Sequence, residues 1–112
     1  MTRQCWLVSN GTVLASAERA DSHHDKGRGL LGRDHFEGAM VLTNTRWVHS
    51  FGMRFAIDVA HLDSNGNVLR VATLVPHRLG VPVKKASTVV EAAAGAFERW
   101  GLKVGDVVEL RE

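Results

Sequence analysis

The chain has 112 residues, of which 45% are hydrophobic and 23% charged, and its formal net charge is +2. These values predict one soluble globular domain over residues 1–112, and the scattered basic residues argue against nucleic-acid binding. Cys5 is the single cysteine, which excludes an internal disulfide, and no apolar run forms a signal-peptide core or approaches the roughly 18 residues of a membrane span. We therefore expect a cytoplasmic protein without membrane insertion.

The N-terminal part of the chain predicts a β-hairpin followed by a short helix. Apolar, β-prone runs at residues 5–9 and 12–16 are separated by Asn10-Gly11, the pair that tight hairpin turns favour because both central residues take positive φ. A short helix is expected over residues 20–31, since a capping side chain lies near its start and basic residues gather toward its end.

Residues 47–59, which follow a strand candidate at 39–44, alternate between large apolar side chains and small or charged ones. The large side chains are Trp47, Phe51, Met53, Phe55, Ile57 and Val59. His49 falls in the same register, and period-2 alternation predicts a half-buried strand with this series on its buried face. Because the whole stretch from Trp47 to Asp63 is too long for one strand, we expect a break near Ser50–Gly52, which leaves the facing of His49 open.

The C-terminal half predicts three further strands and a second helix. The strands are expected at residues 68–75, 88–92 and 107–110, with turns at 63–67 and 105–106 and a loop at 77–87. An alanine-rich helix is expected over residues 92–100, and Gly101 with Leu102 forms a glycine-type helix end.

These elements predict an α+β fold that is mostly β. The tight turns between successive strands favour antiparallel pairing. The expected architecture is therefore a rolled antiparallel sheet or a small, partly open barrel with two short helices.

His49 is the first candidate for a functional residue. One interpretation is an imidazole that contacts a ligand near Gly52, with Phe51 and Met53 as an apolar wall. The other is a core histidine that is hydrogen-bonded to backbone, the commoner role for a histidine on an apolar strand face.

Asp58 is the second candidate. Arg54 lies four residues before it, roughly 13 Å away in a flat strand and too far to pair, so Arg78 and Arg28 are the cations considered as partners. Asp58 and an arginine either orient a polar ligand or form a structural salt bridge. The candidate ligand-binding residues are His49, Phe51, Met53, Asp58, Arg78 and Arg28.

The sequence shows no known catalytic, nucleotide or metal motif. Six histidines are present, but neither a His-Glu-x-x-His nor a Cys-x-x-Cys spacing occurs, and no glycine-rich phosphate loop follows a strand. Ser50, His49 and Asp58 supply the residue types of a triad, yet Ser50 and His49 point to opposite faces of a strand. We therefore predict no catalytic residue, no metal and no cofactor.

Four blocks of the chain carry a family resemblance. The blocks are Arg28–Arg33, His49–Phe55, Ile57-Asp58 with Leu62-Asp63, and Gly101–Asp106. In this order they resemble the DUF192 family of small uncharacterised bacterial and archaeal proteins. The resemblance implies a compact, mostly-β domain without an agreed activity, and some members are similar to proteins encoded near pilus-assembly or secretion genes. The chain departs from the family pattern at Ala56, His61 and Ala93, where His61 stands in a normally apolar position.

The function hypothesis is a binding module, rather than an enzyme, for a small polar ligand or an extended peptide segment of a partner. One alternative is a hydrolase-like enzyme that uses His49 and Asp58 as an acid–base pair. The other is an accessory factor of a pilus or secretion machine with a protein partner, which rests on the resemblance alone.

Overall fold

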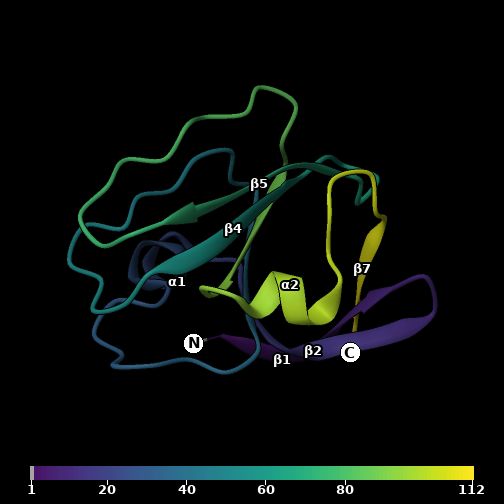
Figure 1. Cartoon of the computed structure of the whole chain (residues 1–112), viewed down its shortest axis with the longest axis horizontal. Coiled ribbons are helices and arrows are strands. Elements are labelled where there is room, and N and C mark those ends of the chain that lie inside the picture. The colour runs from purple at the N-terminus through teal and green to yellow at the C-terminus, as the bar shows by residue number, and fades with distance from the viewer. Residues whose placement is uncertain (1) are drawn as a thin grey trace.

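The computed structural model describes residues 2–112, and its strands form a single sheet that curls into a half-barrel (Figure 1). Within these residues the chain has seven strands and two short helices, so the expected mostly-β, α+β fold is confirmed. The strands are β1 (Arg3–Ser9), β2 (Thr12–Ala20), β3 (Ala39–Thr43), β4 (Ile57–Leu62), β5 (Val68–Leu74), β6 (Thr88–Ala93) and β7 (Val108–Arg111). The helices are α1 (His23–Arg28) and α2 (Ala96–Trp100).

Local sequence signals set the ends of the first elements. Asn10 and Gly11 take φ values of 51° and 75°, so the turn between β1 and β2 forms as expected. α1 begins after Ser22, whose hydroxyl accepts a hydrogen bond from the Asp25 amide at 3.0 Å. α1 is shorter than expected because the chain leaves the helix at Gly29, where φ is 45°.

The sheet has the strand order β5-β4-β6-β3-β2-β1-β7. Neighbouring strands are antiparallel, as expected, except for β2 and β3, which run parallel. The reason is that β2 and β3 are joined by a long crossover containing α1, and a crossover connection is what parallel strands require. The crossover brings α1 and the turn after it against the face formed by β3 and β6.

Residues 47–55 form a loop instead of the predicted strand, and β4 begins only after this 47–55 loop. Between Trp47 and Phe51 the burial is the reverse of the predicted alternation. Val48 and Ser50 are buried, whereas Trp47 and Phe51 are 42% and 48% exposed. Further along the same series Met53 is buried as predicted, so the alternation fails only before Gly52.

Backbone hydrogen bonds to Ser50 explain why this polar residue is in the core. Its hydroxyl donates to the Val75 carbonyl at 2.6 Å and accepts from the Arg78 amide at 2.8 Å. The neighbouring His49 forms an isolated β-bridge with Leu79. Ser50 thus joins the 47–55 loop to the loop after β5, and both loops cover the same end of the sheet.

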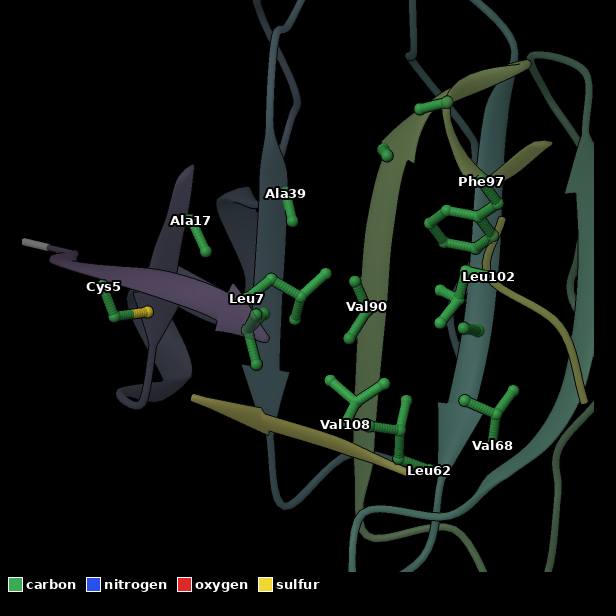
Figure 2. Packing of buried hydrophobic residues seen from close by; sticks show 14 residues of the cluster. Cys5, Leu7, Ala17, Ala39, Leu62, Val68, Val90, Phe97, Leu102 and Val108 are labelled. Atoms are coloured by element: carbon green, nitrogen blue, oxygen red, sulfur yellow. The ribbon is translucent and has the colours of Figure 1, made fainter. Parts of the chain in front are cut away.

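Both faces of the central strands are buried. Ala39 and Val41 of β3 belong to one hydrophobic cluster, and Met40 and Leu42 belong to a second one, because alternate residues of a strand face opposite sides. Figure 2 shows the first cluster, into which Phe97 of α2 packs. The second cluster lies under the turn after α1 and the 47–55 loop, and it forms the base of the candidate site.

Candidate functional site

A pocket of about 340 Å³ lies between α1, the loop that follows β3 and the face formed by β3 and β6. Residues from three separate parts of the sequence line it, and they include Lys26, Arg28, Leu42, His49, Met53 and Glu91. The crossover that makes β2 and β3 parallel supplies one wall, and the loop that replaced the predicted strand supplies another.

Glu91 of β6 lies at the base of this pocket and is 5% exposed. Its ladder neighbours are Met40 on β3 and Val59 on β4, so the side chains beside it on the same face are apolar. Within residues 2–112 the Glu91 carboxyl makes no hydrogen bond or ion pair. A buried carboxyl without a partner is costly in its ionised form.

Burial has a direct consequence for the chemistry of Glu91. It raises the pKa of this carboxyl from the ordinary value of 4.5 to about 7, because the charged form loses its hydration among apolar neighbours. The end of α1 covers the carboxyl closely, since a Cβ at Gly29 would lie 3.4 Å from Oε1 of Glu91. Near neutral pH the group can therefore either donate a hydrogen bond or accept one.

Basic residues surround the other side of the pocket. Lys26 and Arg28 lie in the last turn of α1, and His23 lies in its first turn. The Lys26 ammonium donates a hydrogen bond to the Thr43 carbonyl at 3.0 Å, which fixes its position next to the pocket. The Arg28 side chain is exposed and takes part in no ion pair within residues 2–112.

His49 also lines the pocket, and its ring lies between two aromatic side chains. The ring centroids of Trp47 and Phe51 are 5.9 Å and 5.2 Å from that of His49. The Nδ1 atom accepts a hydrogen bond from the Phe51 amide at 3.2 Å, so the imidazole is held by its own loop. His49 is half-buried, so it is neither a fully buried core histidine nor a fully exposed ligand contact.

Three of the six predicted ligand contacts, Arg28, His49 and Met53, line this pocket. Phe51 does not line the pocket, but its ring packs against His49, which does. The remaining two, Asp58 and Arg78, lie elsewhere and have backbone or side-chain partners of their own.

Asp58 is a structural anchor for the start of α2. Its Oδ1 atom accepts a hydrogen bond from the Thr73 hydroxyl at 2.9 Å. Its Oδ2 atom accepts from the amides of Gly95 and Phe97 at 3.0 Å and 3.2 Å. Both oxygens of this carboxylate are thus bonded to protein groups.

Asp58 and the pocket lie on opposite faces of the sheet. Asp58 pairs with Ala92 in the ladder, and the next rung pairs Val59 with Glu91, so the two carboxyls point in opposite directions. The structure therefore does not bring Asp58 and His49 together as an acid–base pair. Nor does Arg78 approach Asp58, because its guanidinium is directed to the His77 carbonyl at 3.4 Å.

Sequence reasoning did not select Glu91, the residue that dominates the pocket. A signal was present, because Glu91 is the single acid in the apolar run 89–94, and a charge inside a buried strand requires a partner or a shifted pKa. His61 on β4 is comparable, since it is 3% exposed, its nitrogens lack hydrogen bonds of normal geometry, and burial lowers its pKa. His61 lies beside a separate, small cavity of about 50 Å³.

Residues 2–112 contain no group of three or more histidine, cysteine or acidic side chains that could hold a metal ion. In the same residues, neither helix has the length and the apolar character that crossing a bilayer requires.

Comparisons with known proteins place the chain in one family. The DUF192 family model, described as "Uncharacterized ACR, COG1430", matches residues 6–110. A UPF0127 protein of Pyrococcus abyssi is 44% identical over 62 residues, which are 55% of this chain and 53% of that protein. A UPF0127 protein of Thermococcus sibiricus is 29% identical over 96 residues, covering 80% of this chain and 62% of that protein. The chain therefore spans about half the length of the Pyrococcus abyssi protein.

Two crystal structures share the fold. A protein of unknown function from Novosphingobium aromaticivorans superposes with a TM-score of 0.79 at 19% identity, over 96% of this chain and 84% of that one. A putative transcription regulator from Sinorhizobium meliloti superposes with a TM-score of 0.82, also at 19% identity, over 98% of this chain and 94% of that one. At this identity the likeness shows the fold alone. The family model covers nearly the whole chain, and the chain therefore belongs to the DUF192 family.

Proposed function

We propose that this protein is a binding module for a small polar ligand that enters the pocket under α1 and bonds to Glu91. The observation that carries the proposal is the buried Glu91 carboxyl, which faces the pocket and has no partner among residues 2–112. Within residues 2–112 the Glu91 oxygens make no hydrogen bond and are not sealed from the pocket, so they are available to a molecule that enters it. A ligand in the pocket supplies the missing partner.

The rest of the pocket fits this role. Its volume of about 340 Å³ suits a small molecule, since ligand pockets start at about 300 Å³. Leu42 and Met53 are buried apolar wall residues, while Glu91, Arg28 and His49 supply polar groups. An apolar wall with a few directed polar groups is the usual composition of a small-molecule site.

The pKa of Glu91 near 7 favours a second candidate function, an enzyme in which Glu91 and His49 exchange protons with a substrate. A general base is most effective when its pKa lies near the working pH. This candidate replaces Asp58 of the earlier hypothesis by Glu91. Binding is the first choice because it requires the pocket and its anchor, whereas catalysis also requires a reacting atom between the two side chains.

Fragment mapping by NMR tests the binding function without knowledge of the natural ligand. We would titrate ¹⁵N-labelled protein with a library of small polar fragments at millimolar concentration and follow the amide shifts. A Gly27→Trp variant blocks the pocket, because Gly27 lines it and a Cβ there meets no other atom within 4 Å. Arg78→Ala serves as the matched control outside the pocket.

The expected result is that fragments shift amides of α1, the 47–55 loop and β6 in the wild type and in Arg78→Ala, but not in Gly27→Trp. Fragments that shift the sheet edges β5 or β7 instead would support a peptide-binding edge and contradict the pocket. A library without any binder at the pocket would also overturn the proposal.

A further inference from the structure

The pocket carries charges of opposite sign at two depths. Glu91 is buried at its base, whereas Lys26 is half-buried and Arg28 exposed on α1. Within residues 2–112 no ion pair joins Glu91 to either cation, although all three line one pocket. The acidic and the basic groups of this site therefore do not neutralise each other.

Apolar side chains form much of the remaining wall. Leu30 and Leu42 are 1% and 4% exposed, and both line the pocket together with Met53. This wall favours contact with hydrocarbon, because apolar surface is then removed from water. A ligand that fits the whole pocket thus needs two different polar ends and an apolar middle.

We infer that the pocket takes a small zwitterion, with its ammonium group on Glu91 and its anionic group against Arg28 and Lys26. This inference rests on the proposed binding function and assigns the chemical class of its ligand. The Lys26 ammonium has donors left after its bond to the Thr43 carbonyl, and the planar Arg28 guanidinium is suited to carboxylate or phosphate.

Ligands of a single charge fit less well. A simple amine pairs with Glu91, but the cations on α1 repel it at the entrance. A simple carboxylate is attracted by those cations, but its apolar end leaves Glu91 buried without a partner. His23 and His49 are the other titratable groups of the lining.

The test uses ω-amino acids and their single-charge analogues as probes in isothermal titration calorimetry at pH 7. The zwitterions γ-aminobutyrate and ε-aminocaproate are compared with butylamine, hexylamine, butyrate and hexanoate. We expect at least one zwitterion to bind ten-fold or more tightly than both of its analogues. Comparison of the two chain lengths reports the spacing between Glu91 and the cations of α1.

Proton release separates an ammonium–Glu91 contact from unspecific binding. At pH 7 about half of the Glu91 carboxyls carry a proton, because burial raises their pKa to about 7. An ammonium group favours the ionised form, so binding releases roughly half a proton to the buffer. Titrations in buffers of different ionisation enthalpy measure this release.

Two variants assign the two ends. Glu91→Gln should lose ten-fold or more in zwitterion affinity and should release no proton. Arg28→Gln should weaken zwitterions and carboxylates about equally while leaving amines unchanged or slightly tighter. Arg78→Gln lies outside the pocket and should bind all probes as the wild type does.

The inference is overturned when uncharged or single-charge fragments occupy the pocket and zwitterions bind no better than their analogues. In that case the proposed binding function stands and only the ligand class is wrong. If instead no fragment maps to the pocket, the binding function itself has failed, and the two outcomes are therefore distinguishable.

Discussion

Asp58 and Glu91 are two buried carboxyls on the neighbouring strands β4 and β6, and each is 5% exposed. Asp58 accepts three hydrogen bonds from protein groups, whereas Glu91 accepts none within residues 2–112. The two carboxyls are thus equally buried but differ in their hydrogen bonding. Of these two buried acids, Glu91 therefore marks the candidate site, because its carboxyl is the one that the fold leaves for a ligand.

The two environments differ because the two faces of the sheet are covered differently. On one face, backbone amides at the start of α2 have no acceptor within the helix, and they donate hydrogen bonds to Asp58. On the other face, Glu91 lies between Met40 and Val59 and under the end of α1, and no donor among residues 2–112 bonds to it. The first carboxyl stabilises a helix end, and the second opens into a pocket.

The largest effect is expected for Asp58→Ala. Removing this carboxylate leaves the amides of Gly95 and Phe97 without an acceptor, and breaking a buried, charged network costs about 3–5 kcal/mol. Urea unfolding followed by circular dichroism measures the loss. A decrease below about 1 kcal/mol would show that Asp58 is not the anchor of α2.

The next effect is a pH dependence of stability due to Glu91. Its folded-state pKa of about 7 is above the ordinary value of 4.5, so its contribution to stability is complete below pH 4.5 and is lost as the pH rises through 7. One pKa unit is worth about 1.4 kcal/mol, which makes the loss roughly 3 kcal/mol. Urea unfolding at a series of pH values should show this slope in the wild type.

The control for this slope is Glu91→Gln, which removes the titrating group and keeps the shape of the side chain. The variant should lose the decline between pH 4.5 and 8, whatever its absolute stability. An unchanged decline in the variant would assign the pH dependence to other groups.

His61→Leu should have a smaller, stabilising effect. Replacing a buried side chain that lacks normal hydrogen bonds by an apolar one gains about 1 kcal/mol at neutral pH. Burial lowers the His61 pKa, so its neutral form is favoured in the fold and the wild type loses stability as the pH falls below about 6.5. Thermal unfolding at pH 5.5 and pH 7.5 should therefore show a larger gain at the lower pH. A smaller gain there would contradict this assignment.

The smallest effect is expected for Thr73→Val, which removes one of the three hydrogen bonds to Asp58 and keeps the side-chain volume. A loss of about 1 kcal/mol in urea unfolding is expected, because the two amide donors remain. A loss equal to that of Asp58→Ala would mean that the amides of α2 contribute little.

Local signals in the sequence predicted much of the fold. Asn10-Gly11 predicted the first hairpin and Gly101 the end of α2, and both act through short-range geometry. A helix was also expected after β2, but over residues 20–31, whereas α1 is the shorter His23–Arg28. The parallel pair of β2 and β3 was missed, because pairing direction depends on the route of the crossover and not on local pattern.

The candidate site was predicted less well than the fold. Arg28, His49 and Met53 were selected and do line the pocket. The strand predicted around His49 was wrong, because the chain there is a loop in which Ser50 is buried while Trp47 and Phe51 are exposed. Glu91 was missed since its lack of a partner is a tertiary property, set by which side chains of β3 and β4 pair beside it.

The protonation of Glu91 tests the contrast between the two carboxyls most directly. A ¹³C NMR titration of the side-chain carboxyl carbons, with Glu91→Gln used for assignment, measures the pKa of this group in the folded protein. We predict a midpoint of about 7 for Glu91. A midpoint near the ordinary glutamate value of 4.5 would show that the carboxyl is solvated or paired, and would contradict its role as the unpartnered anchor of the pocket.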